Sequence, residues 1–498
     1  MEAFVEQAFE WWLRLWPHLV AAAIVLVDIV LSAHAILTKR DTRSTIGWVG
    51  LIWFSPVFGA LAYVLFGVNR IRSRAARMRA GRATIQHEIA GCIPDEGRLT
   101  EAIGPAESPL RALALLGERV TERPLTDCNQ IEPLDGGDIA YAAMLEAIHG
   151  ATRSIGLASY IFDNDPTGRE FAEALAAATR RGVAVRVLID GIGSTYSHPP
   201  ITGLLEESGV RVATFLPTGV PFYFPYANLR THRKIMVVDG AVGFTGGLNI
   251  RDGCRLSRSP AHPVKDMHFR LTGPVVAQLL EVFAEDWQFA TGEALDDDGD
   301  GSLSAPWLPR VQSTGSMPAR GIRFGPDDPD IGRIRLVIVA ALAAARKSVR
   351  VMTPYFLPDD AICQALDVAA MRGVEVDIVI PEENNLALVA WASTSMLWQV
   401  LGRGCNVWKS PPPFDHTKLL VVDGAWAMFG SGNWDERSLR LNFEFNVETY
   451  DRDLCTRLDR HVAGVISRSR RTTLEEVDGR SLPVRLRDGI ARLFSPYL

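Results

Sequence analysis

The sequence is poor in cysteine and has no excess of positive charge. Its 498 residues include six cysteines that are scattered along the chain, so neither a zinc site nor a dense disulfide framework is expected. The formal net charge is −6, which provides no overall basic field to attract nucleic acid. The sequence also has no carboxylate cluster that indicates a divalent metal, and we expect neither a metal nor a cofactor.

The N-terminal region does not have the pattern of a cleaved signal peptide, because residues 1–12 are acidic rather than basic. It has instead two long apolar runs, residues 19–37 and 46–66, and the second carries no charge. Each run is close to the ~20 residues that a bilayer-spanning helix needs. We expect a two-helix transmembrane hairpin over residues 1–69 rather than two buried core helices. Within the first run, Asp28 is expected to be protonated or to face the partner helix.

Positive charges give conflicting signals for the orientation of this hairpin. The arginines at positions 70–82 favour a cytoplasmic body. Lys39, Arg40 and Arg43 in the short link also favour the cytoplasm, although two spans would put the link and the body on opposite sides of the membrane. We expect a multi-pass protein of the cell (inner, cytoplasmic) membrane with a cytoplasmic catalytic body; the alternative is a re-entrant second segment. The basic segment begins a juxtamembrane connector over residues 70–120, which either contacts anionic lipid or only sets the orientation.

From about residue 121 the sequence alternates between strand and helix patterns, and the second half repeats the order of the first. Gly182 and Gly373 end corresponding helices and lie 191 residues apart (373 − 182), while His232 and His416 lie 184 apart (416 − 232). A near-constant offset indicates an internal duplication. We predict an α/β fold of two homologous lobes, each a mixed sheet flanked by helices, in a pseudo-twofold arrangement. The lobes are assigned to residues 121–292 and 333–498, and the linker between them to residues 293–332.

A histidine–lysine motif occurs once in each half. Residues 231–249 read THRKIMVVDGAVGFTGGLN, and residues 416–433 read HTKLLVVDGAWAMFGSGN. On an extended chain, residues two apart face the same way. A histidine beside a lysine suits a phosphate, because lysine supplies charge and imidazole serves as nucleophile or proton carrier. The candidate residues of the two motifs are His232, Lys234, Asp239, Gly247 and Asn249, and His416, Lys418, Asp423, Ser431 and Asn433.

The duplication predicts that the two motifs meet around one phosphodiester. One imidazole would attack phosphorus and form a phosphohistidine, and the other would protonate the leaving alcohol and then deprotonate the acceptor. The sequence does not separate these two roles. The lysines, together with the G-G-x-N and G-S-x-N segments, are predicted to bind phosphate oxygens. Asp266 and Glu444, on the strand expected after each motif, are predicted to orient the histidines, and Asp239 and Asp423 to organise turns.

The doubled pattern resembles the H-x-K-x4-D-x6-G-S-x-N motif of the phospholipase D superfamily, with Gly247 departing from the usual serine. The segments SPVFGALAYVLFGVNR, NLRTHRK, GSGNWDERSLRLNFEFN and ARLFSPYL are similar to its bacterial cardiolipin synthase branch. The resemblance implies phosphatidyl transfer from one phosphatidylglycerol to another with release of glycerol. It also implies that His232 is the nucleophile and His416 the general acid and base. The implied partners are phosphatidylglycerol, anionic membrane lipid and the bilayer; the oligomeric state is not indicated.

Three alternative functions are retained for comparison. A hydrolytic phospholipase D would use the same residues with water as the acceptor and would release phosphatidic acid. A phosphodiesterase acting on nucleic acid is disfavoured by the acidic net charge and the membrane hairpin. A non-catalytic lipid-binding protein is disfavoured because both motifs keep their histidine, lysine, aspartate and asparagine.

Two apolar segments each have two interpretations. LALVAWASTSMLWQ, residues 386–399, forms either an entrance for acyl chains or part of the core of the second lobe. RDGIARLFSP, residues 487–496, lies either on the membrane or packed on the second lobe.

Overall fold

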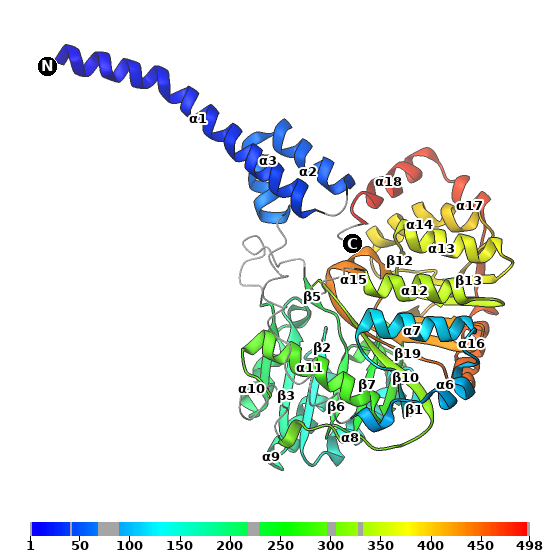
Figure 1. Cartoon of the computed structure of the whole chain (residues 1–498). Helices are drawn as coiled ribbons and strands as arrows, with labels where there is room; N and C mark the ends of the chain where they lie inside the picture. Colours follow the sequence, from blue (N-terminus) through cyan, green and yellow to red (C-terminus); the bar gives the residue numbers. More distant parts are fainter. Residues whose placement is uncertain are drawn as a thin grey trace. The chain divides into compact units, whose positions relative to one another are not determined.

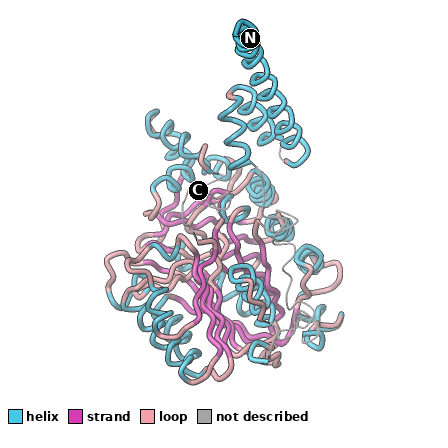
Figure 2. Tube along the Cα trace, turned by 90° about the vertical axis from the view of Figure 1, so that its left-hand side faces the viewer, coloured by secondary structure: helices cyan, strands magenta, loops and turns pink. Residues whose placement is uncertain are grey.

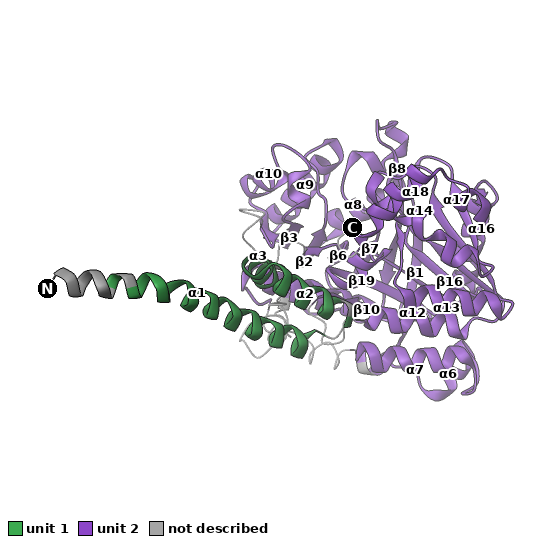
Figure 3. Cartoon of the chain, turned by 90° about the horizontal axis from the view of Figure 1, so that it is seen from above, with its two compact units in different colours: residues 1–74, 219–227 green, residues 75–218, 228–498 purple. Residues whose placement is uncertain are grey.

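The computed structural model describes residues 2–39, 42–67, 89–217, 229–295, 305–326 and 332–495. The chain divides into two compact units, shown in different colours in Figure 3. The first unit contains residues 1–74 with 219–227, and the second contains residues 75–218 with 228–498. The predicted arginine cluster at positions 70–82 lies outside the described residues.

The N-terminal unit begins with one long helix, α1 (Glu2–Thr38), which contains the first apolar run. Its stretch Trp11–Thr38 has a mean hydropathy of 2.4 and, among the described residues, is the one helix long and apolar enough to cross a membrane. The second apolar run is not one helix. It forms α2 (Thr42–Phe54), α3 (Pro56–Ala62) and a π-helical turn, η1 (Tyr63–Gly67).

The break between α2 and α3 lies at Pro56, because proline has no N–H to donate and clashes with the preceding turn. The two arms of the hairpin nevertheless pack on each other through Ala35, Ile52 and Tyr63. Asp28, inside α1, is 2% exposed, which agrees with the second of the two expectations for it, that it faces the partner helix. The expected two-helix transmembrane hairpin is therefore shown only in part: the first arm is one long apolar helix, and the second arm consists of short helices.

The second unit is built on a continuous 16-stranded sheet in the described residues (Figures 1 and 2). Its strands in the first lobe are β1 (Thr126–Asp135), β2 (Ser154–Ser159), β3 (Ala184–Asp190), β4 (Arg211–Phe215), β5 (Arg230–Thr231), β6 (Ile235–Val238), β7 (Val242–Gly246) and β9 (Met267–Thr272). Those of the second lobe are β10 (Met317–Phe324), β11 (Ser348–Met352), β13 (Glu375–Pro381), β14 (Asn406–Ser410), β16 (Leu419–Val422), β17 (Trp426–Gly430), β19 (Asn442–Thr449) and β20 (Arg470–Thr472).

The strand order demonstrates the duplication. It runs β20-β14-β13-β11-β16-β17-β19-β10-β1-β9-β7-β6-β2-β3-β4, so the two halves have the same order when counted outward from the central β10–β1 pair. In each half three strands are parallel, β2-β3-β4 and β11-β13-β14, and the strands nearer the centre are antiparallel. The predicted pair of mixed-sheet lobes is confirmed, and the two sheets are joined edge to edge.

Helices cover both faces of each half of the sheet. On β2, Ile155 and Leu157 lie in one apolar core, whereas Gly156 between them faces Phe283 of a helix on the opposite side. The helices of the first lobe are α8 (Gly137–Gly150), α9 (Pro166–Arg180), α10 (Ile201–Glu207) and α11 (Val275–Thr291). Those of the second are α12 (Arg333–Ala344), α13 (Asp360–Met371), α14 (Ala387–Leu401), α15 (Glu436–Arg440), α16 (Arg452–Ile466), α17 (Leu474–Asp478) and α18 (Leu482–Arg492).

The structure corrects two boundaries expected from the sequence. Residues 317–324 of the predicted linker form β10, a central strand between β1 and β19. Its residue Arg320 is buried, with its guanidinium paired to Glu448, so the polar pattern of MPARGIRF conceals a core strand. In the predicted connector, α6 (Glu96–Ile103) and α7 (Pro109–Thr121) contribute to the apolar core of the second lobe.

Candidate active site

Each histidine–lysine motif lies just before a strand and is held by the opposite lobe. His232 follows β5, which pairs with β19, and its backbone N–H donates to the carbonyl of Phe443 at 2.9 Å. His416 follows β15 (Phe414–Asp415), which pairs with β8 (Val264–Lys265), and its N–H donates to the carbonyl of Lys265 at 2.7 Å. The motifs were expected inside extended strands, but three residues of each precede β6 or β16 and cross to the other lobe.

The two histidines face each other across the junction of the lobes. Their ring centroids are 6.4 Å apart, with planes at 80°. Nδ1 of His232 lies 3.0 Å from Oε1 of Glu444, and Nδ1 of His416 lies 2.8 Å from Oδ2 of Asp266. The predicted orienting carboxylates are therefore in place, and each comes from the opposite lobe. Because each Nδ1 is engaged by a carboxylate, Nε2 is the ring atom left for chemistry.

The two lysines lie beside the histidines in buried positions. Nζ of Lys234 donates to the carbonyl of His232 at 2.6 Å, and Nζ of Lys418 donates to the carbonyl of His416. Both lysines are among the buried polar residues of the molecule. The Nζ of Lys234 also lies 5.4 Å from the ring centre of Tyr160. Two ammonium groups and two imidazoles are thus gathered in one water-poor region.

Burial of this basic cluster lowers the pKa values of its members. It lowers the pKa of His232 to about 4, with repulsion from Lys234 contributing and attraction to Glu444 opposing the shift. It lowers the pKa of Lys418 to about 8, against the attraction of Asp266. The cause in both cases is removal of a cation from water. An anion bound between these groups would raise their pKa values again and stabilise their protonated forms. This is the behaviour expected of a phosphate-binding site.

The two carboxylates differ in their surroundings. Besides His232, Glu444 accepts hydrogen bonds from Ser431 Oγ at 2.5 Å, from Asn442 Nδ2 at 3.3 Å and from Ser438 Oγ. These donors and the nearby basic groups outweigh burial, so the pKa of Glu444 is lowered. Ser438 and Asn442 were not predicted, although both lie a few residues before Glu444 in the sequence.

Asp266 has fewer donors. Apart from His416, it accepts a hydrogen bond from the backbone N–H of Met267 at 2.8 Å. Burial and the nearby Asp415 raise the pKa of Asp266 to about 8, although Lys418 opposes the shift. The pKa of His416 is lowered by burial and by Lys418. The His416–Asp266 pair therefore retains a titratable proton near neutral pH, whereas Glu444 beside His232 is ionised.

The small residues of the motifs serve the carboxylates rather than an open phosphate site. The hydroxyl of Ser431 donates to Glu444 at 2.5 Å, and its contact with phosphate stays a prediction. A Cβ on Gly247 would stand 2.3 Å from Oδ2 of Asp266, so the glycine lets that carboxylate approach. Asn249 accepts from the N–H of Ile161 at 3.1 Å, which anchors its side chain. Asn433 is buried, and its Oδ1 accepts no hydrogen bond from the described part of the chain.

The motif aspartates lie at the far end of the motif strands. Asp239 accepts hydrogen bonds from the backbone N–H groups of Thr152, Arg153 and Ser154. Asp423 accepts equivalent bonds from Arg346, Lys347 and Ser348. Both aspartates have φ of 54° and occupy the turn after β6 or β16. Their contacts agree with the turn-organising role predicted from the sequence.

Two tyrosines complete the walls around the histidines. The ring of Tyr160 lies 5.2 Å from that of His232, and the ring of Tyr355 lies 6.2 Å from that of His416. The hydroxyl of Tyr355 donates to Oδ1 of Asn385 at 2.9 Å. Neither tyrosine was predicted, although each follows the first parallel strand of its lobe, in SYIF and in PYF.

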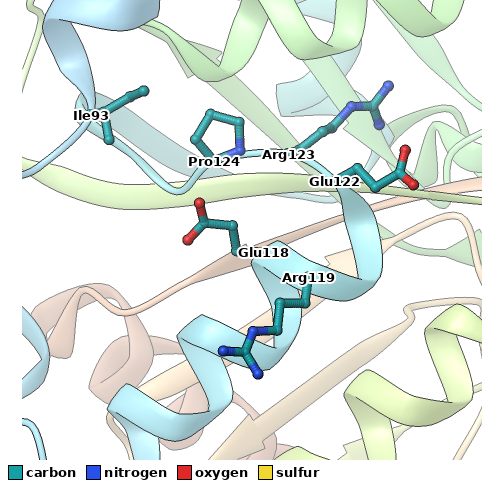
Figure 4. Close-up of a pocket in the computed structure, with 6 residues that line it drawn as sticks. All are labelled: Ile93, Glu118, Arg119, Glu122, Arg123 and Pro124. Carbon is teal, nitrogen blue, oxygen red and sulfur yellow. The ribbon is translucent and has the colours of Figure 1, made fainter.

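A separate hollow lies elsewhere on the second unit (Figure 4). This pocket of about 530 Å³ is lined by Ile93, Glu118, Arg119, Glu122, Arg123 and Pro124. It contains none of the histidines, lysines or carboxylates described above, and its mixed charges do not form an anion site. The chemistry therefore belongs to the junction of the lobes.

Comparisons with known proteins show similarity along nearly the whole chain. A family model described as "Cardiolipin synthase, PLD-like domain" matches residues 144–287 and 338–466, and one described as "Phospholipase_D-nuclease N-terminal" matches residues 20–67. Cardiolipin synthase of Geobacillus kaustophilus (strain HTA426) is 31% identical over 98% of this chain and 94% of its own. Cardiolipin synthase A of Pseudomonas putida (strain W619) is 32% identical over 96% of this chain and 98% of its own.

A solved structure supports the fold independently. The crystal structure of phosphatidylserine synthase from Haemophilus influenzae Rd KW20 aligns with a TM-score of 0.58 and 16% identity. The alignment covers 78% of this chain and all of that chain. At this identity the likeness concerns the fold alone, and it agrees with the two-lobed body described here.

Proposed function

This chain belongs to the family of cardiolipin synthases with phospholipase D-like domains, and we propose that it transfers a phosphatidyl group from one phosphatidylglycerol to another, releasing glycerol. The observation that carries the proposal is the pair of histidines 6.4 Å apart, each held by a carboxylate of the opposite lobe. The two buried lysines beside them supply the charge that a phosphodiester requires. The enzyme is thus a phosphatidyltransferase.

The difference between the two carboxylates supports a division of roles between the histidines. Ionised Glu444 accepts the Nδ1–H of His232, which leaves a lone pair on Nε2 for attack and stabilises the positive charge that develops on the ring. The proton held by the His416–Asp266 pair is available at Nε2 of His416 for a leaving group. We therefore assign the nucleophile to His232 and the acid–base function to His416.

The reaction then proceeds in two displacements. Nε2 of His232 attacks phosphorus, the bond from phosphorus to the glycerol oxygen breaks, and that oxygen takes the proton from His416. A hydroxyl of the second phosphatidylglycerol next gives its proton to His416 and attacks phosphorus, and the N–P bond breaks. Lys234 and Lys418 neutralise the non-bridging oxygens in both steps. Neither step uses a metal, a cofactor or an external oxidant.

Product analysis tests this function. The purified full chain is incubated with vesicles of phosphatidylglycerol, and the lipids and free glycerol are measured by mass spectrometry. We expect equal amounts of cardiolipin and glycerol. Phosphatidic acid without cardiolipin would establish the hydrolytic alternative instead. His232→Asn and His416→Asn should each abolish both products, with the unfolding temperature unchanged as the control for folding.

Trapping the intermediate tests the assignment of roles. Acid-labile phosphatidyl groups are captured by rapid mixing, proteolysis at neutral pH and mass spectrometry of the peptides. We expect the adduct on the peptide that contains His232. An adduct confined to the peptide of His416 would reverse the two roles without changing the overall reaction.

The membrane topology also belongs to this proposal. The long apolar helix α1 and the family make the protein membrane-associated. We place a second crossing over α2 and α3 and the catalytic body on the cytoplasmic side, because positive charges follow the second run. Impermeant thiol labelling of a cysteine introduced at the exposed Met371 in sealed cells is expected to fail until the cells are permeabilised. Labelling before permeabilisation would contradict the cytoplasmic body.

A further inference from the structure

The last helix of the body, α18 (Leu482–Arg492), packs on the protein with one face and leaves an apolar stripe on the other. Asp488 and Ala491 are buried and belong to the inward face. On the outward face, four side chains that follow one another at intervals of three or four residues are 50–78% exposed: Leu482, Leu486, Ile490 and Leu493. A helix that already has its inward contacts does not need this second apolar face for folding.

Arginines flank the stripe on both sides. Arg485 and Arg492 are seven residues apart, two helical turns, and therefore lie along one edge. Neither forms an ion pair with another residue in the described ranges. Arg487 lies along the other edge, where its guanidinium is 4.3 Å from the ring centre of Trp391 and also pairs with the buried Asp488 at 2.7 Å. This local gathering of positive charge contrasts with the net charge of −6 of the chain.

The neighbouring helix α14 (Ala387–Leu401) extends the apolar surface. It packs against α18, and Figure 1 shows the two helices side by side. Its N-terminal end exposes Leu386 and Leu388, and Trp398 is exposed further along. Of the two interpretations of residues 386–399, the structure supports a mixture: Val389 and Ala392 are core, while the flanking leucines face outward.

A chain of direct contacts connects this surface to the active site. Ala491 of α18 and Val389 of α14 share a small apolar cluster with Tyr355. The ring of Tyr355 lies 6.2 Å from that of His416. The helix that carries the exposed stripe is therefore connected to a catalytic histidine through this apolar cluster and Tyr355.

We propose that α18, with the exposed end of α14, is a docking surface for an anionic phospholipid bilayer. An apolar stripe edged by arginines is the pattern of a helix that lies in the plane of the membrane interface, and anionic head groups attract the flanking arginines. Docking there holds the wall of the active site against the head-group layer, where the phosphate of a lipid substrate lies. The inference rests on the proposed function for its purpose, but its physical test does not.

Lipid contact is measured by fluorescence quenching in the full chain. Cys92 and Cys128 are half-buried and could react with the label, so both are replaced by serine. The other four cysteines are buried and are kept. Leu486→Cys carries a bimane label, and the matched control is Ile139→Cys, which has a similar exposure. Ile139 belongs to α8, a helix that Figure 1 draws at the opposite end of the body from α18. The protein is reconstituted into phosphatidylcholine vesicles with phosphatidylglycerol, with and without lipids spin-labelled on the acyl chains.

We expect spin-labelled lipid to quench the label at position 486 at least threefold more strongly than the label at position 139. Equal quenching at both positions would overturn the proposal. A label at 486 that is shielded both from lipid quencher and from aqueous iodide would also overturn it, because the stripe would then be covered by protein, either the chain's own hairpin or a second copy.

Comparing the rates on vesicles and on monomeric substrate distinguishes failure of docking from failure of the proposed function. The double variant Leu486→Glu, Leu493→Glu is compared with Ile139→Glu on vesicles and on monomeric short-chain phosphatidylglycerol. We expect the ratio of vesicle rate to monomer rate to fall at least about tenfold for the double variant alone, because two exposed leucines that would insert into the bilayer become charged. An unchanged ratio refutes docking. A wild-type chain that makes no cardiolipin from either substrate refutes the function, while the quenching result still decides the docking.

Discussion

Replacing Asp239 with alanine tests whether the aspartate of the motif acts in stability or in chemistry. Its carboxylate accepts three backbone hydrogen bonds, from Thr152, Arg153 and Ser154, and a fourth from the Thr152 hydroxyl at 2.7 Å. At about 0.5–1.5 kcal/mol of net stabilisation each, with some of the site open to solvent, their loss costs about 2–4 kcal/mol. Alanine at φ 54° adds about 1 kcal/mol of backbone strain.

The expected effect on catalysis is small, because Asp239 is distant from the reacting atoms. Seven residues separate it from His232, and at about 3.3 Å per residue an extended chain of that length spans ~20 Å. We expect Asp239→Ala to lower the free energy of unfolding by about 3–5 kcal/mol. Well below its unfolding temperature, its turnover per folded molecule should stay within a factor of about three of the wild type.

Two comparisons make this test decisive. Asp239→Gly loses the same hydrogen bonds but tolerates the positive φ, so it should be about 1 kcal/mol more stable than the alanine variant. His232→Ala should show the opposite behaviour, with activity abolished and stability little changed. Urea unfolding followed by circular dichroism gives the stabilities, and cardiolipin formation gives the rates. A hundredfold loss of turnover in Asp239→Ala with unchanged stability would refute the reasoning.

Three further predictions concern the carboxylate pairs. Glu444→Gln should lower the turnover at least ~10–100-fold, because a charge-assisted hydrogen bond to the nucleophile is lost; a rate within twofold of the wild type would exclude this role. The value of kcat/KM should decrease at pH below about 4, where His232 becomes protonated, and at pH above about 8, where the pair containing Asp266 loses its proton. Asp266→Asn should remove the decrease at high pH. Ser431→Ala removes one donor from Glu444, so it should move the acid limb and reduce the rate less than Glu444→Gln does, as measured by the same profile.

The elements of both lobes could be predicted from the sequence because their patterns are local and repeated. Apolar runs such as VAVRVLID and VEVDIVI form the buried parallel strands β3 and β13, and the helices before them end at Gly182 and Gly373. Local patterns failed where distant partners decide the outcome. The strand β10 contains a buried arginine whose charge is compensated by Glu448 of a later strand. The hydrogen bond from Ser431 to Glu444 could not be predicted for the same reason, because the two residues lie 13 positions apart.

The sequence by itself determined the chemical inventory: two copies of histidine, lysine and asparagine, with Asp266 and Glu444 as partners for the imidazoles. Only the tertiary structure decided which carboxylate serves which histidine. The sheets join through β1 and β10, and each motif hydrogen-bonds to the backbone of the opposite lobe. As a result Glu444 reaches His232 and Asp266 reaches His416. The physical reason is that the sequence shows which chemical groups are present. The pairing of buried charges depends on which surfaces of the two lobes pack against each other.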